Sequence, residues 1–125
     1  MEKSDRKSIL IVDDEEVIRE FLSEVLSDDY DVSLAEDGDV AIKKISEHPF
    51  DLIITDLKMP RVSGDEVVKF ARETRPDVPV IIVSGYSTLY AVSQSVNHGA
   101  CAFLSKPFSI AELTRTIDQS LETNA

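Results

Sequence analysis

Short apolar runs alternate with longer amphipathic stretches along the chain. Five runs are continuously or almost continuously hydrophobic, as is typical of strands in a parallel sheet that is covered on both faces. They span residues 9–12, 32–35, 52–55, 80–83 and 102–105. The run at 32–35 is the weakest because it contains Ser33, so we expect that strand at an edge of the sheet.

The amphipathic stretches that follow these runs predict five helices. In the first, residues 15–26, apolar side chains recur at helical spacing, and we expect them to form one buried stripe: Val17, Ile18, Phe21, Leu22, Val25 and Leu26. The third and fifth helices open on Ser-x-x-Glu capping boxes at 63–66 and 109–112. Apolar positions at 40–45 and 89–96 indicate the second and fourth. This alternation predicts an α/β fold, a mostly parallel sheet with helices on both faces.

Residues that could bind a ligand or take part in catalysis follow four of the five apolar runs directly. They are Asp13, Asp14, Asp56, Ser84, Gly85 and Lys106. Because the carboxyl ends of parallel strands meet at one edge of a sheet, we expect these side chains to converge there. Three carboxylates at close range repel one another, and a hard cation such as Mg²⁺ together with a lysine ammonium would compensate for that repulsion. The pattern indicates a small cation site that could bind a phosphoryl group, with a carboxylate as candidate nucleophile.

Each of these residues also has a purely local interpretation. Asp13 and Asp14 could cap the helix that begins near residue 15. Asp56 could be a turn residue before Pro60, and Lys106 a solvated side chain. Their joint placement after parallel strands favours a shared site over these separate interpretations.

The motifs at the strand ends resemble those of receiver domains of bacterial two-component response regulators. The resemblance covers about residues 7–122 and is carried by Ile11-Val12-Asp13-Asp14-Glu15, Asp56-Leu57-Lys58-Met59-Pro60, Val83-Ser84-Gly85 and Phe103-Leu104-Ser105-Lys106-Pro107-Phe108. It implies a doubly wound, flavodoxin-like (βα)₅ sandwich of three layers with strand order 2-1-3-4-5. We accordingly divide the chain into a flexible N-terminus, residues 1–7, and one receiver domain, residues 8–123.

The resemblance implies a phosphoacceptor and a metal site. Asp56 is the expected phosphoacceptor, which takes a phosphoryl group from a sensor histidine kinase or a histidine phosphotransfer protein. Asp14, Asp56 and the backbone carbonyl of Lys58 are the expected direct ligands of Mg²⁺, for which Mn²⁺ could substitute. Asp13 would hold the ion mainly through water.

The resemblance also implies a switch. Lys106, whose peptide bond to Pro107 is expected to be cis, would neutralise the phosphoryl oxygens. Ser84 would turn toward the phosphoryl group, and Phe103 would rotate inward. These movements would reshape the fourth helix, fifth strand and fifth helix. A plain core position is the competing interpretation of Phe103.

Three further positions are expected to tune the reaction. Lys58 and Tyr86 would flank the path of the water that attacks the acyl phosphate, and a bulky Tyr86 would slow hydrolysis. Gly85 is small, which would leave the phosphoryl pocket open to a donor. The competing interpretation is that Lys58 and Tyr86 are solvated surface residues.

Composition narrows the classes of partner. Asp and Glu number 24 against 13 Lys and Arg, and the resulting net charge of −11 disfavours binding to nucleic acid or membrane through this domain. A single Cys101 excludes an internal disulfide, and the lack of a signal peptide or a membrane-length apolar run predicts a cytoplasmic location. By resemblance, the domain controls a downstream protein or an attached output domain. A homodimer through the fourth helix, fifth strand and fifth helix is one expected assembly.

Two other functions remain open at this stage. A magnesium-dependent phosphatase of the haloacid-dehalogenase type also uses an Asp nucleophile after a strand, but that family carries a second Asp two residues later, where this chain has Lys58. The other alternative is an interaction module that is not phosphorylated. We expect a signalling domain rather than an enzyme, with chemistry limited to its own phosphorylation and autodephosphorylation.

Overall fold

The computed structural model describes residues 6–85 and 99–123. Within these ranges, five strands form one parallel sheet in the order β2-β1-β3-β4-β5. The strands are β1 (Ser8–Val12), β2 (Asp31–Ala35), β3 (Leu52–Asp56), β4 (Val80–Ser84) and β5 (Ala102–Ser105). The predicted α/β class, strand order and edge position of the second strand are confirmed.

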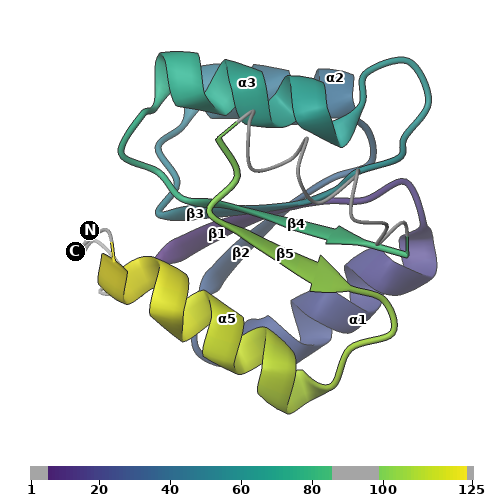
Figure 1. The fold of residues 1–125 in the computed structure, drawn as a ribbon, viewed down its shortest axis with the longest axis vertical. Coiled ribbons are helices and arrows are strands. Elements are labelled where there is room, and N and C mark those ends of the chain that lie inside the picture. Colours follow the sequence, from purple (N-terminus) through teal and green to yellow (C-terminus); the bar gives the residue numbers. More distant parts are fainter. Residues whose placement is uncertain (1–5, 86–98, 124–125) are drawn as a thin grey trace.

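Helices cover both faces of this sheet, which gives three layers. The described residues contain α1 (Glu16–Leu26), α2 (Gly38–Glu47), α3 (Gly64–Thr74) and α5 (Ile110–Thr123). Helices α2 and α3 lie on one face, and α1 and α5 on the other (Figure 1). The fourth helix, expected around 89–96, lies outside the described residues.

Continuous apolar strands are explained by two separate cores. In β1, Leu10 and Val12 point into the cluster beneath α2 and α3, whereas Ile9 and Ile11 point into the cluster beneath α1 and α5. Successive side chains of a strand face opposite sides, so a strand buried on both faces needs apolar residues at every position. The side chains of β3 and β4 alternate between the two cores in the same way. This packing holds the central strands in place and so positions the residues at their carboxyl ends.

Local hydrogen bonds confirm where three helices begin. Ser109 and Glu112 form the predicted reciprocal capping box, with both bonds at 3.0 Å. Ser63 Oγ accepts from the backbone N–H of Glu66 at 3.3 Å. Helix α2 is capped by Asp37, whose carboxylate accepts from the backbone N–H of Val40 at 2.9 Å.

The predicted buried stripe of α1 is wrong at two of its positions. Leu22 is buried, but Val17 is 74% exposed and Phe21 is 39% exposed. An α-helix turns by about 100° per residue, so only a narrow set of positions can face the sheet. Val17 and Phe21 lie on the flank of that set, where spacing along the sequence cannot separate a buried side chain from an exposed one.

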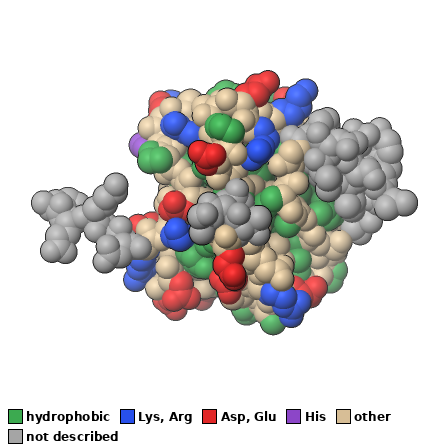
Figure 2. Space-filling view, turned by 60° about the vertical axis from the view of Figure 1, so that its left-hand side comes forward, with side chains coloured by type: hydrophobic (Ala, Val, Ile, Leu, Met, Phe, Trp, Pro, Cys, Tyr) green, Lys and Arg blue, Asp and Glu red, His purple; other side chains and the backbone are tan. Residues whose placement is uncertain are grey.

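Charged side chains of both signs are interspersed on the face that Figure 2 shows, and apolar side chains are scattered among them.

Among the described residues, no helix combines the length and the apolar character needed to cross a bilayer.

Candidate functional site

Four acidic side chains meet at the carboxyl edge of the sheet. Asp13 follows β1 and is 2% exposed, and Asp56 is the last residue of β3 and is 7% exposed. One carboxylate oxygen from each of Asp13, Asp14, Glu15 and Asp56 lies within 4.8 Å of the others. The structure thus brings the three expected carboxylates together and adds Glu15. The sequence signal for Glu15 was its place directly after Asp14, in an acidic run that continues into α1.

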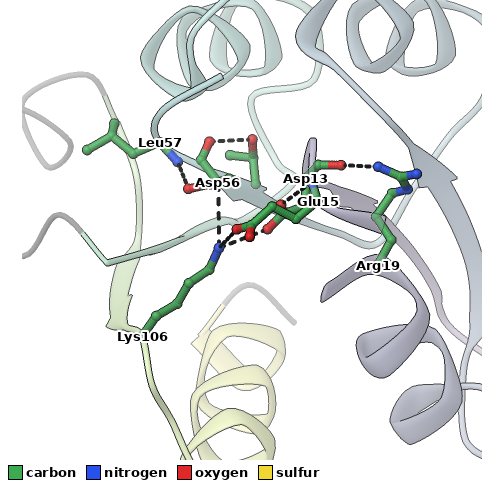
Figure 3. Close-up of polar contacts among 7 residues, drawn as sticks. Asp13, Glu15, Arg19, Asp56, Leu57 and Lys106 are labelled. Atoms are coloured by element: carbon green, nitrogen blue, oxygen red, sulfur yellow. Dashed lines mark hydrogen bonds and ion pairs between the residues drawn. The ribbon is translucent and has the colours of Figure 1, made fainter. Parts of the chain in front are cut away.

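Lys106 extends into this acidic group from the end of β5 (Figure 3). Its Nζ lies 3.1 Å from Asp13 Oδ2, 3.5 Å from Asp56 Oδ2 and 3.5 Å from Glu15 Oε1. The peptide bond between Lys106 and Pro107 is cis, as expected. One ammonium is therefore shared among three carboxylates.

Backbone hydrogen bonds orient the two buried carboxylates. Asp13 Oδ1 accepts from the backbone N–H of Glu15 at 2.9 Å, and Asp56 Oδ1 accepts from that of Leu57 at 2.7 Å. The other oxygen of each carboxylate faces Lys106 (Figure 3). The interpretation of Asp13 as a cap of α1 is wrong, because the N-cap residue is Glu15 and no side chain caps the helix.

The charges of the group perturb one another. Burial raises the pKa of Asp13, and burial followed by the charge of Asp13 raises the pKa of Asp56. For Lys106, burial would lower the pKa, but the carboxylates of Asp56, Asp13 and Glu15 outweigh it, and the pKa is raised. Four carboxylates around one ammonium leave an excess of negative charge. An all-oxygen donor set with that excess fits a hard divalent cation such as Mg²⁺.

The remaining candidates near Asp56 are placed by β4 and by the loop after β3. Ser84 is the last residue of β4 and is buried, and its carbonyl accepts from the backbone N–H of Lys106 at 2.9 Å. Within residues 6–85 and 99–123, nothing lies within 4 Å of a Cβ added at Gly85, so these residues leave open space at that position. Lys58 is exposed in the loop two residues beyond Asp56.

The other two candidates lie farther along the chain. Phe103 is half-buried in β5 and packs against the core cluster beneath α2 and α3. Tyr86 lies outside the described residues.

Comparison with known proteins identifies the family. The family described as the response regulator receiver domain matches residues 9–118. The chain belongs to this family. Its strand order is therefore that of a receiver domain in the two-component signalling class.

The similar proteins include a longer response regulator and single receiver domains. Response regulator RR06 of Streptococcus pneumoniae is 38% identical over 111 residues, which cover 88% of this chain and 51% of RR06. The chain thus spans about half the length of that curated relative.

Two solved structures extend the similarity to nearly the whole chain. The CheY-like receiver domain protein from Methanospirillum hungatei JF-1 has a TM-score of 0.91 and 32% identity, covering 95% of this chain and 96% of that one. The beryllofluoride-activated NtrC4 receiver domain dimer has a TM-score of 0.88 and 34% identity, covering 94% and 98%.

Lys106→Met should strengthen metal binding by this receiver domain. The ammonium and Mg²⁺ attract the same carboxylates, so removing the ammonium should raise the Mg²⁺ affinity by about tenfold, the scale of one partly screened charge a few ångströms away. Without Mg²⁺ the variant should unfold at a lower temperature than wild type, because the carboxylates lose their partner. Saturating Mg²⁺ should remove that difference.

Thermal unfolding with and without Mg²⁺ measures both effects. Lys43→Met, which removes an exposed charge from α2, is the matched control, and it should change the Mg²⁺ affinity and the unfolding temperature much less than Lys106→Met does. Weaker Mg²⁺ binding by Lys106→Met would contradict the competition between the two cations.

Proposed function

We propose that this chain is the phosphoacceptor of a two-component signalling system and that Asp56 is the residue phosphorylated. The observation that carries the proposal is the environment of Asp56. This buried carboxylate is oriented by the backbone N–H of Leu57. It lies 3.5 Å from the ammonium of Lys106 and close to the carboxylates of Asp13 and Asp14. A nucleophilic oxygen, a cation-binding acidic group and a fixed positive charge are the parts that phosphoryl transfer to a carboxylate requires.

In the proposed reaction, a carboxylate oxygen of Asp56 attacks the phosphorus of a phosphohistidine. The new P–O bond forms as the P–N bond breaks, and the imidazole leaves and takes up a proton. Lys106 neutralises phosphoryl oxygens, and the Ser84 hydroxyl, at the end of the neighbouring strand, donates to them. Transfer of this kind depends on positioning and charge stabilisation more than on acid–base chemistry.

The proposed metal site uses Asp14, Asp56 and the Lys58 backbone carbonyl as direct ligands, with Asp13 acting through water. Bound Mg²⁺, or Mn²⁺ in its place, would supply further neutralisation of negative charge at the phosphoryl group. The carboxylates of Asp13, Asp14 and Asp56 already share one small region, which supports this assignment. Glu15 adds negative charge to the same region.

The proposed switch runs from Ser84 to Phe103. A phosphoryl group brings about two negative charges at neutral pH and would draw the Ser84 hydroxyl toward it. Phe103 would then rotate inward and reshape β5 and α5, the described part of the expected output face. Phe103 lies in β5 and is half-buried, which leaves it between the core and the surface. The output is a downstream protein or an attached domain, and a homodimer through this face is a further proposal.

We propose that Lys58 and Tyr86 set the lifetime of the acyl phosphate and that Gly85 keeps the pocket accessible. Open space at Gly85 supports the last of these roles. The domain would then act in the cytoplasm, on itself only, with autodephosphorylation as its return step.

An apolar surface formed by residues of α1 and of the segment after Lys106 is suited to the phosphodonor. Val17 and Phe21 on α1 are exposed, and Ile110, 52% exposed, begins α5. The ring of Phe21 packs against that of Phe108, with 6.5 Å between centroids. Phe108 lies two residues after Lys106, so this surface adjoins the acidic group.

The chemistry of this surface indicates the kind of phosphodonor. Glu16 and Glu20 are exposed on α1 beside Val17 and Phe21, which gives the apolar surface an acidic border. We propose that a histidine kinase or histidine phosphotransfer protein docks here through an apolar helix face with a basic border.

Val17→Asp should separate docking from chemistry. It should slow transfer from a phosphorylated histidine kinase that labels the wild-type chain by about tenfold or more, because a charge replaces apolar contact area at the interface. Labelling by acetyl phosphate should stay unchanged, since that donor needs no protein interface. The fold should hold, because Val17 is exposed and an acidic residue in the first turn of a helix is favourable.

Ser46→Asp on α2, in the opposite helical layer, adds the same charge and serves as the control. It should leave both transfer reactions at the wild-type rate. Equal slowing of the two donors by Val17→Asp would reject the docking surface.

The function itself is tested by incubating the chain with labelled acetyl phosphate and Mg²⁺. We expect one acid-stable, base-labile phosphoryl group per chain. No label together with no Mg²⁺ binding would favour the interaction module. Continuous hydrolysis of a generic phosphate ester would favour the phosphatase, which Lys58 in place of a second Asp argues against.

A further inference from the structure

The loop that follows Asp56 contains an unusual turn centred on Arg61. The backbone N–H of Val62 donates to the carbonyl of Pro60 at 2.8 Å, which closes a three-residue γ-turn. Arg61 at its centre has a φ of +65°, in the left-handed region that L side chains rarely adopt. Among the described residues, it is the only non-glycine with positive φ. Something outside the turn must therefore stabilise it.

Two ion pairs connect this turn to the start of α2. Arg61 Nη2 lies 2.9 Å from Asp37 Oδ2, and Arg61 Nε lies 3.1 Å from Asp39 Oδ2. Asp37 uses its other oxygen to cap α2 through Val40, so its carboxylate is already fixed when Arg61 binds it. The guanidinium group thus binds two carboxylates at the N-terminal end of α2.

Close packing supports the same contact. A Cβ added at Gly38 would lie 2.5 Å from Val62 Cγ1 and 2.6 Å from the Val62 carbonyl oxygen. The backbone of α2 therefore approaches the turn as closely as a glycine allows. The ion pairs of Arg61 and the contact between Gly38 and Val62 hold the turn from adjacent positions.

The turn shapes the loop that carries a proposed metal ligand. The loop spans residues 57–63, and the backbone N–H of Gly64 donates to the Leu57 carbonyl at 2.8 Å across its base. Lys58 lies between that base and the turn, so the conformation at Arg61 helps set the direction of the Lys58 carbonyl.

We propose that Arg61 is a positioning residue for the metal site, because its two ion pairs hold the turn at 60–62 and keep the Lys58 carbonyl directed at the cation. This inference rests on the proposed function. It assigns to Asp37 and Asp39 a role in metal binding, although neither belongs to the acidic group around Asp56.

The test compares Arg61→Ala with Arg61→Gly in the full 125-residue chain. Alanine removes the ion pairs and keeps the unfavourable φ, whereas glycine removes the pairs but adopts positive φ readily. We expect Arg61→Ala to weaken Mg²⁺ binding by about three- to tenfold, the scale of two surface ion pairs and one unfavourable φ. Arg61→Gly should bind Mg²⁺ as well as wild type or better.

The sign of the effect separates positioning from charge. Loss of a positive charge from an acidic chain should by itself strengthen Mg²⁺ binding, and Lys69→Ala, at an exposed position on α3, measures that contribution. Mg²⁺ titrations followed by amide chemical shifts suit the chain because it has no Trp. A tighter or unchanged Mg²⁺ affinity in Arg61→Ala would overturn the inference.

Hydrogen exchange gives a second readout without metal. In Arg61→Ala, the Gly64 amide should exchange about three- to tenfold faster than in wild type. Its hydrogen bond to the Leu57 carbonyl closes the loop, and we expect that bond to open more often when the ion pairs of Arg61 are lost. Arg61→Gly should retain wild-type protection. Wild-type protection together with wild-type Mg²⁺ affinity in Arg61→Ala would overturn the turn-holding role.

The outcomes distinguish the inference from the proposed function. If the wild-type chain binds Mg²⁺ and both Arg61 variants bind it as tightly as wild type does, the inference fails and the proposed function stands. If the wild-type chain does not bind Mg²⁺, both fail.

Discussion

Asp56→Asn should abolish covalent phosphoryl capture completely. The amide oxygen of asparagine can still accept the 2.7 Å hydrogen bond from the Leu57 N–H, so the side chain should keep its place. An amide is a poor nucleophile, however, and cannot form the acyl phosphate at a useful rate. Incubation with labelled acetyl phosphate and Mg²⁺, followed by acid quenching, measures the loss against the wild-type chain.

The matched control for this variant is Asp51→Asn. Asp51 accepts from the backbone N–H of Ser8 at 2.8 Å, at the opposite end of the sheet from Asp56, and asparagine can preserve that bond. This control should be labelled as fully as wild type. A stoichiometric, base-labile label on Asp56→Asn would contradict the assignment of the phosphoacceptor.

Asp56→Asn should also stabilise the metal-free fold at neutral pH. Burial, followed by the charge of Asp13, raises the pKa of Asp56 in the folded chain above its unfolded value. A group with a raised carboxyl pKa favours the folded state in acid, and that contribution is lost as the pH rises through the folded pKa. The neutral amide avoids this loss, so the variant should gain about 1 kcal/mol at neutral pH, the usual scale of a single substitution. The gain should fade as the pH falls, and urea unfolding in a chelator measures it.

Gly64→Ala should destabilise the fold by about 3 kcal/mol or more, because a backbone shift is the only way to fit the methyl group. Gly64 is the first residue of α3 and packs directly on the strand end that carries Asp56. A Cβ at this position would overlap the carbonyl oxygen of Asp56 and lie 2.8 Å from Leu57 Cα. Both are backbone atoms, which cannot rotate away as the end of a side chain can. Urea unfolding gives the free energy, and Mg²⁺ titration should show weaker binding in the fraction that folds.

Gly85→Ala is the matched control because it makes the same chemical change beside the same site. A Cβ there would meet none of the residues that the structure describes within 4 Å, so the free energy of unfolding should stay within about 0.5 kcal/mol of wild type. If Gly64→Ala were as stable as Gly85→Ala, the close contact between α3 and the Asp56 backbone would be disproved.

Much of the site was predictable because it lies next to strongly patterned strands. Leu52 to Asp56 is a buried strand whose last residue is the candidate nucleophile, and Ser84 ends the next strand in the same way. Once the apolar runs are recognised, the residues that follow them must share the carboxyl edge of a parallel sheet. Lys106 follows the same logic from β5, and its approach to Asp13 and Asp56 needed no further information.

Other features depended on three-dimensional packing that local patterns do not encode. Glu15 joins the acidic group because it directly follows Asp14 at the start of α1. Val17 and Phe21 are exposed because they lie on the flank of the α1 face that packs on the sheet. Arg61 meets Asp37 and Asp39 across more than twenty residues of sequence. No periodicity marks such a contact.

The order of residues along the chain was enough to predict the alternation of strands and helices, the two-sided core and the edge of the sheet where the acidic residues meet. These follow from hydrophobic burial, which repeats with the period of each element and can be read along the chain. The contacts between surface side chains, and the helix positions that stay exposed, emerge only when the chain is folded. Those outcomes depend on how the layers rotate against one another, and that rotation is set by many distant contacts acting together.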